Sequence, residues 1–231
     1  RPLARGDRRA VHLIEVLRRG VGDTFDAGLV NGPRGKGTVA ALTADALTLT
    51  FVWDPPPAPR TALALVVGLP RPQTARDILR DATTLGATAL HFVRTEKADP
   101  GYAQSTLWTS GEWRRHVLAG AEQAFDPAIP EVTFTHPLAE ALGLLATSPS
   151  PTATRLALDN YESAAALGDF HVIRENPVVL AIGAERGWSA AEREALRAHG
   201  FALVHLGARV LRTESAVTAA LAIVRAKLGL M

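Results

Sequence analysis

The stretch that decides the fold is "NPVVLAIGAERGWSAAEREALRAHGFALVHLG", which runs from Asn176 to Gly207. Its apolar start ends in a glycine-flanked loop, Gly183 to Gly187, and a helical pattern follows. Ser189 with Glu192 three residues later is typical of a capping box, and Gly200 suits the end of that helix. A second apolar run comes directly after it. Strand, helix and strand in this spacing predict one unit of a parallel sheet.

The same alternation continues on both sides of this stretch. Strands are predicted for residues 62–69, 88–93, 131–135 and 154–159, and helices for residues 73–86, 111–124, 137–146 and about 214–230. This pattern predicts an α/β domain with a mostly parallel sheet. The last helix carries an apolar stripe typical of core or of a subunit interface, formed by Val217, Leu221, Val224 and Leu228. The segment "SPSPT", Ser148 to Thr152, is interpreted as a surface loop.

The stretch "WDPPPAPR", Trp53 to Arg60, is the clearest break in the pattern. Its four prolines in five residues exclude a helix and a central strand, and favour a stiff, extended linker. Before it, residues 22–30, 36–43 and 46–53 have the composition of strands. The sequence therefore predicts a small β-rich domain over residues 1–58 and an α/β domain over residues 59–231.

The composition is that of a folded, soluble protein. Of the 231 residues, 47% are apolar, enough for a hydrophobic core, and 21% are charged. The lack of cysteine excludes disulfides, thiolate nucleophiles and cysteine zinc sites. No apolar run approaches the ~20 residues that span a bilayer, and the seven histidines have no HxxxH spacing. We therefore expect a cytoplasmic protein with no membrane segment and no metal.

Positive charge is concentrated at the start of the chain. Residues 1–40 hold eight Lys or Arg and four acidic residues, although the net charge of the whole chain is only +2. A basic patch of this kind favours a polyanion such as RNA, because each neutralised phosphate releases counterions. We expect RNA contacts from Arg5, Arg8, Arg9, Arg18 and Arg19. A solvated, arginine-rich face would explain the charge equally well.

Two polar segments follow predicted strands, at the edge where a parallel sheet binds its ligands. The first is the loop Gly183–Gly187, whose glycines let a ligand approach the main chain closely. The second is "LGARVLRTESA", Leu206 to Ala216, which places two arginines and a glutamate between a strand and a helix. Tight turns alone would explain either segment. The chain has no GxGxxG, GxxxxGK[ST] or GxSxG motif, so no Rossmann, P-loop or hydrolase site is predicted.

The residues from Gly183 onward resemble the carboxyl-terminal signature of bacterial 16S ribosomal RNA uridine-N3 methyltransferases, in the SPOUT superfamily. That signature reads GPEGGWS, then an acidic helix, then GF and LGxRILRxETA. The matching positions are Gly183, Glu185, Gly187, Trp188, Ser189, Gly200, Phe201, Leu206, Gly207, Arg209, Leu211, Arg212, Thr213, Glu214 and Ala216. Upstream, "HLIEVLRRGVGD", His12 to Asp23, resembles the family's HxxxVLRxxxGD, and "AEQAFDPAIPEV", Ala121 to Val132, resembles its AEQSxRxxxPxI. The resemblance covers nearly the whole chain.

This resemblance implies a small PUA-like β-barrel domain followed by a SPOUT-type α/β domain with a carboxyl-terminal trefoil knot. It also implies that S-adenosylmethionine is the methyl donor, held by main-chain groups and apolar walls. The donor-binding residues expected on this basis are Leu158, Ile182, Gly183, Glu185, Gly187, Leu206, Gly207, Val210, Leu211, Thr213 and Ala216.

Methyl transfer to uridine N3 needs aligned reactants and stabilisation of the anion that forms when the imide loses its proton. An arginine can pair with uracil oxygens through two parallel hydrogen bonds. We expect Arg212 first and Arg209 second in this role, with Glu214 holding one of them in place. The alternative is that these three residues form an ion-pair network that only fixes the structure.

Five positions depart from the family pattern. Ala184 and Arg186 replace a proline and a glycine of the family pattern, Asp126 replaces an arginine, and Asp81 and Thr84 replace a lysine and a glutamate.

The main hypothesis is a homodimeric enzyme that methylates N3 of a uridine in 16S ribosomal RNA, free or within the small ribosomal subunit. The alternatives are a catalytically inactive RNA-binding protein of the same fold and a SPOUT methyltransferase with another RNA target.

Overall fold

The computed structural model describes residues 2–147 and 152–231. The chain divides into two compact units. The small unit comprises Arg1–Pro59 with Asp126–Ala128, and the large unit comprises Arg60–Phe125 with Ile129–Met231. Residues 148–151 of the surface loop predicted at Ser148–Thr152 lie outside the described residues.

The small unit is an antiparallel sheet with the strand order β1-β4-β3-β2. Its elements are β1 Pro2–Ala4, α1 Arg8–Val11, the π-helical turn η1 His12–Val16, β2 Thr24–Gly28, β3 Arg34–Leu42 and β4 Ala46–Trp53. The three strands predicted before the prolines are therefore confirmed as β2, β3 and β4. The sequence pattern did not reveal β1, α1 or η1. Closure of this sheet into a barrel stays a prediction.

Alternation along the strands builds the core of the small unit. Leu47 and Leu49 point to the same side of β4 and are at most 4% exposed. They pack with Val39 of β3 and with Ala10 and Leu13 of the helical segment. Strands of period two bury one face in this way and leave the other to solvent.

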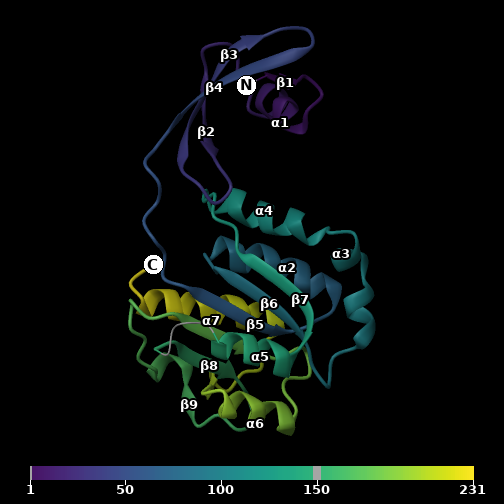
Figure 1. Cartoon of the computed structure of the whole chain (residues 1–231), viewed down its shortest axis with the longest axis vertical. Coiled ribbons are helices and arrows are strands. Elements are labelled where there is room, and N and C mark those ends of the chain that lie inside the picture. The colour runs from purple at the N-terminus through teal and green to yellow at the C-terminus, as the bar shows by residue number, and fades with distance from the viewer. Residues whose placement is uncertain (1, 148–151) are drawn as a thin grey trace. The chain divides into compact units, whose positions relative to one another are not determined.

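The large unit is built on a seven-stranded parallel sheet with the order β7-β6-β5-β10-β8-β11-β9. Figure 1 labels β5, β6, β7, β8 and β9 of this sheet. Its strands are β5 Leu63–Gly68, β6 Ala89–Arg94, β7 Glu131–Pro137, β8 Thr154–Leu158, β9 Ala165–Ala166, β10 Val178–Ile182 and β11 Ala202–His205. Its helices are α2 Pro72–Thr84, η2 Pro100–Gln104, α3 Thr106–Thr109, α4 Trp113–Gln123, α5 Leu138–Thr147, η3 Leu167–Asp169, α6 Ala190–Ala198 and α7 Thr213–Lys227. The predicted α/β fold is confirmed, and only β9, η2, α3 and η3 were not expected.

Helices cover both faces of this sheet, which explains why β5 and β10 at its centre are apolar at every position. In β10, Val178, Leu180 and Ile182 face the core beneath α2 and α7. Val179 and Ala181 face the core beneath α5 and α6. The chain therefore changes face between α6 and α7, through residues 206–212.

The apolar stripe of α7 lies inside the chain. Val217, Leu221, Val224 and Leu228 are at most 1% exposed and belong to the core shared with α2 and the sheet. The sequence left two roles open for this stripe, the core of the chain or a subunit interface. The core role is confirmed. The prediction of a subunit interface on this stripe is wrong, because the same chain already covers these side chains. The trefoil knot stays a prediction.

Candidate functional site

Three loops meet at the carboxyl edge of the parallel sheet. They follow β8, β10 and β11, and these strands are neighbours, because Leu158 pairs with Ile182 on one side and with Val204 on the other. Residues 159–163, 183–188 and 206–212 therefore lie side by side, although they are far apart in the sequence. This is the edge at which open parallel sheets bind ligands.

The loop Gly183–Gly187 needs its two end glycines for different reasons. A Cβ on Gly183 would lie 2.8 Å from Cα of Gly187, so the two ends of the loop are in direct contact. Gly187 has φ +63°, and its N–H donates a 2.8 Å hydrogen bond to the oxygen of Ala184. A β-carbon would strain that conformation. The loop is a tight turn, buried at Gly183 and Ala184 and exposed at Glu185 and Arg186.

Hydrogen bonds from the segments that follow β5 and β6 hold the loop Gly183–Gly187 in place. Lys97, after β6, donates from Nζ to the main-chain oxygens of Trp188 at 2.7 Å and Arg186 at 3.4 Å. The main-chain N–H of Arg71, at the start of α2, donates to Oε1 of Glu185 at 3.0 Å. Glu185 therefore anchors the loop through its side chain. Sequence reasoning missed Lys97, whose signal is a polar run directly after a predicted strand.

Trp188 and Ser189, which directly follow the loop, fix its carboxyl end. Trp188 is fully buried, and its Nε1–H donates to the main-chain oxygen of Leu158 at 3.1 Å. Ser189 and Glu192 form the predicted capping box, with hydrogen bonds of 2.7 and 3.2 Å, so this prediction is confirmed. The second carboxylate oxygen of Glu192 accepts from the N–H of Glu96 at 2.8 Å. These bonds tie together the loops after β6, β8 and β10.

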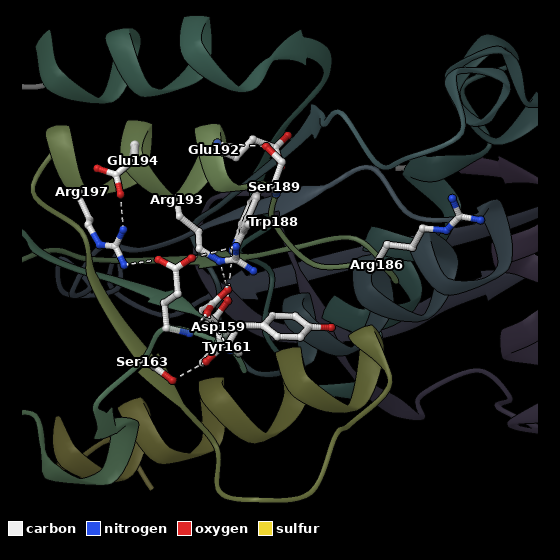
Figure 2. Close-up of polar contacts among 12 residues, drawn as sticks. Asp159, Tyr161, Ser163, Arg186, Trp188, Ser189, Glu192, Arg193, Glu194 and Arg197 are labelled. Carbon is white, nitrogen blue, oxygen red and sulfur yellow. Dashed lines mark hydrogen bonds and ion pairs between the residues drawn. The ribbon is translucent and has the colours of Figure 1, made fainter.

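A buried ion pair fixes the turn after β8 (Figure 2). Nε of Arg193 in α6 lies 2.7 Å from Oδ2 of Asp159, and both side chains are at most 9% exposed. Oδ1 of Asp159 accepts from the N–H groups of Tyr161 and Glu162 at 2.8 and 2.6 Å. Burial by itself would raise the pKa of Asp159, but the hydrogen bonds from Arg193, Glu162 and Tyr161 outweigh it and lower that pKa. Sequence reasoning missed this pair, because its members are separated by a helix and two strands.

The segment after β11 presents open main chain and apolar side chains. Gly207 has φ +105°, its N–H donates to Nδ1 of His205 at 3.0 Å, and a Cβ on it would meet no described atom within 4 Å. Val210 is 79% exposed and Leu211 is 40% exposed. Thr213 is buried where α7 begins, and Ala216 is half-buried on that helix. Exposed apolar side chains beside an open glycine suit a ligand of mixed polarity.

Arg209 and Arg212 are exposed and flank these apolar residues. Within residues 2–147 and 152–231, neither guanidinium forms a hydrogen bond or ion pair, and neither contacts the half-buried Glu214. The ion-pair network considered from sequence is therefore not formed in this structure. Both guanidinium groups are available to an external ligand.

The five arginines expected to contact RNA lie on the small unit, and all are exposed. Arg9 is paired with Asp7 at 2.7 Å, and Nη1 of Arg5 donates to the oxygen of Thr43 at 3.1 Å. In the described part of the chain, the guanidinium groups of Arg8, Arg18 and Arg19 have no hydrogen-bond or ion-pair partner.

No helix among the described residues is long and apolar enough to cross a membrane. No group of three or more His, Asp or Glu side chains in those residues is arranged to hold a metal.

The chain matches known proteins over nearly its whole length. The family model described as "RNA methyltransferase domain" matches residues 56–225. The "Ribosomal RNA small subunit methyltransferase E" of Treponema pallidum (strain Nichols) is 34% identical over 225 residues, which cover 95% of this chain and 83% of the relative. The chain belongs to this family of RNA methyltransferases. The family match contains all three loops at the carboxyl edge of the sheet.

A further relative and a solved structure are also similar to this chain. The "Ribosomal RNA small subunit methyltransferase E 1" of Borreliella burgdorferi is 26% identical over 166 residues, covering 72% of this chain and 68% of the relative. The crystal structure of a "Ribosomal RNA small subunit methyltransferase E" from Neisseria gonorrhoeae, bound to S-adenosyl methionine, superposes with a TM-score of 0.79. The two sequences are 23% identical, and the match covers 98% of this chain and 92% of the Neisseria chain, so this likeness shows the fold alone.

Proposed function

We propose that this chain methylates N3 of a uridine in 16S ribosomal RNA, with S-adenosylmethionine as methyl donor. The observation that carries the proposal is the convergence of residues 159–163, 183–188 and 206–212 at one edge of the sheet. The two loops of the resemblance to uridine-N3 methyltransferases are among them. The names of the Treponema and Borreliella relatives support a substrate in the small-subunit ribosomal RNA.

The residues at this edge fit S-adenosylmethionine. We assign its main-chain contacts to Gly183 and Gly187 of the tight turn and to Gly207, beside which there is open space, and its apolar wall to Val210 and Leu211. The remaining expected donor-binding residues are assigned to the same site: Leu158, Ile182, Glu185, Leu206, Thr213 and Ala216. When bound, the donor supplies the electrophilic methyl group. Its presence in the Neisseria relative supports this assignment.

Arg212, with Arg209 second, is assigned to the uracil ring. Loss of the N3 proton spreads negative charge over the two neighbouring carbonyl oxygens, and a guanidinium can donate to an anion of this kind without covalent chemistry. Both arginines are exposed and without a side-chain partner among the described residues. Glu214, half-buried in the first turn of α7, is assigned to hold one of them when the RNA is bound.

The β-rich domain predicted over residues 1–58 is assigned to RNA binding through Arg5, Arg8, Arg9, Arg18 and Arg19. The α/β domain predicted over residues 59–231 is assigned to methyl transfer. The remaining parts of the proposal are a homodimer, a trefoil knot at the carboxyl edge, action on 16S ribosomal RNA or the small subunit, and a cytoplasmic location. The dimer does not rest on the apolar stripe of α7, which is buried within the chain.

Two measurements test the proposal. Titration calorimetry should show binding of S-adenosylmethionine to the purified chain, and mapping of methylated uridines in 16S ribosomal RNA should show one N3 mark lost in a deletion strain. Absence of donor binding would leave the inactive RNA-binding protein. Donor binding with an unchanged 16S pattern would indicate another RNA target.

A further inference from the structure

Tyr161 is an aromatic residue that the chain leaves exposed beside the glycine loop. It lies three residues after β8 and is 76% exposed. Its Cε2 lies 4.0 Å from the position of a Cβ built on Gly187, so the ring borders the loop at that glycine. The hydroxyl forms no hydrogen bond within residues 2–147 and 152–231. Core packing therefore does not explain this ring.

The ring is fixed from one side only. Cζ of Arg193 lies 5.1 Å from the centre of the Tyr161 ring, and Arg193 is itself held by Asp159 at 2.7 Å and Glu162 at 3.2 Å. The main-chain N–H of Tyr161 is bound to the same Asp159. Figure 2 shows the ring extending away from this ion-pair cluster. A ring that is already ordered loses little conformational freedom when a ligand stacks on its free side.

Arg186, the residue before Gly187, supplies a positive charge in the same loop. It is exposed, and its guanidinium has no partner among the described residues. Figure 2 shows it extending away from the Asp159–Arg193 cluster. Its backbone is restrained, because its main-chain oxygen lies 3.4 Å from Nζ of Lys97. An exposed arginine without an acidic partner suits a phosphate.

We propose that Tyr161 and Arg186 form a nucleotide subsite for single-stranded RNA beside the glycine loop. Tyr161 stacks on a base of the substrate strand, and Arg186 contacts a phosphate of the same strand. The adenine of S-adenosylmethionine could also stack on an aromatic ring, but that donor carries no phosphate to engage Arg186. This inference rests on the proposed function, because it takes the substrate to be RNA.

The first test uses a fluorescent ten-nucleotide oligouridine and an abasic ribose-phosphate chain of the same length. Tyr161→Leu should weaken oligouridine binding roughly tenfold, whereas Tyr161→Phe should bind like the wild type, because stacking needs the ring and not the hydroxyl. Binding of the abasic chain should not respond to either Tyr161 variant. Arg186→Gln should weaken binding of both probes and lower the slope of log K against log salt by about 0.7.

Arg174→Gln is the matched control for charge. Arg174 is also exposed, but it precedes β10 and its oxygen accepts from Thr61, so it lies at the amino edge of the sheet. This variant should bind both probes like the wild type. Equal losses in Arg174→Gln and Arg186→Gln would overturn the phosphate contact.

Photocrosslinking identifies directly which ligand stacks on the Tyr161 ring. An oligouridine carrying 4-thiouridine should crosslink to the peptide that contains Tyr161, and Tyr161→Leu should lose this product. Calorimetry with S-adenosylmethionine should give the same affinity in Tyr161→Leu and wild type. Loss of donor affinity with unchanged RNA binding and crosslinking would show that the ring serves the adenine, and would overturn the subsite.

The subsite and the proposed function can fail separately. If the wild type binds donor and methylates 16S ribosomal RNA, but the Tyr161 and Arg186 variants bind both probes like Arg174→Gln, the subsite is wrong and the function stands. If the oligouridine binds and crosslinks at Tyr161 but no N3 mark depends on the protein, the subsite stands and the function is wrong.

Discussion

Nζ of Lys97 lies 2.7 Å from the main-chain oxygen of Trp188, so the loop after β6 holds the glycine loop after β10. These two strands are separated by β5 in the sheet. Hydrogen bonds from a charged donor are about twice as strong as neutral ones. The shape of Gly183–Gly187 therefore depends on a side chain from the other half of the sheet.

Replacing Lys97 should loosen this loop without unfolding the protein. Lys97→Met keeps most of the side chain's length but removes both hydrogen bonds, and we expect the affinity for S-adenosylmethionine to fall about tenfold in calorimetry. Lys227→Met, in the exposed last turn of α7, is the matched control and should bind donor normally. Equal donor affinities in the two variants would show that the loop keeps its shape without Lys97.

Gly207 tests whether the donor occupies the space beside the second loop. Gly207→Ala and Gly207→Val both strain a backbone with φ +105°, and a Cβ there meets no described atom within 4 Å. The two variants therefore differ mainly in two methyl groups that point into open space. We expect at least a tenfold lower donor affinity for Val than for Ala, with similar melting temperatures. Similar affinities would place the donor elsewhere.

Local patterns predicted most of this fold, because they depend on residues close in sequence. The capping box of Ser189 and Glu192 places the start of α6, and the apolar runs place β5, β6, β8, β10 and β11. The short elements η2 and α3 were missed, because four or five residues carry too little periodicity to be recognised.

The candidate site was predicted only in outline. The two glycine segments were found from their own residues, but their supports are long-range. Lys97 is 91 residues from Trp188, and Arg193 is 34 residues from Asp159. The stripe of α7 shows the same limit, since an apolar face predicts burial but not whether the same chain or a second one covers Val217 and Leu221.

Asp159 should stabilise the large unit in a pH-dependent way. Its pKa is lowered in the folded state, so its contribution is fully present above the ordinary value of about 3.9 and is lost as pH falls through the lowered pKa. Asp159→Asn should cost about 2–4 kcal/mol at pH 7, because the buried Arg193 loses this carboxylate and keeps only its pair with the more exposed Glu162. Urea unfolding at pH 7 and pH 3 checks this. The variant should lose less stability on acidification than the wild type, and equal losses would argue against the pair.

Arginines of the small unit should account for much of the salt dependence of the RNA-binding constant. Arg8 and Arg19 have no described partner, so Arg8→Gln with Arg19→Gln should lower the slope of log K against log salt by roughly 1.4, or 0.7 for each phosphate contact. Arg9→Gln should change the slope less than Arg8→Gln, because Arg9 already pairs with Asp7 at 2.7 Å. Donor affinity should be the same in all these variants. A loss of donor binding would contradict the separation of roles between the units.

Arg212 is the residue whose replacement tests the chemistry. Because its guanidinium has no partner among the described residues, Arg212→Ala should leave the melting temperature nearly unchanged. Single-turnover methylation should nevertheless slow roughly a hundredfold, the range for loss of a preorganised hydrogen-bond donor to a developing anion. Arg212→Lys should recover only part of the rate, because an ammonium cannot make the planar pair of hydrogen bonds that a guanidinium makes. Donor affinity should not change, which separates this effect from that of Lys97→Met. A near-normal rate in Arg212→Ala would shift the role to Arg209, where the same three measurements apply.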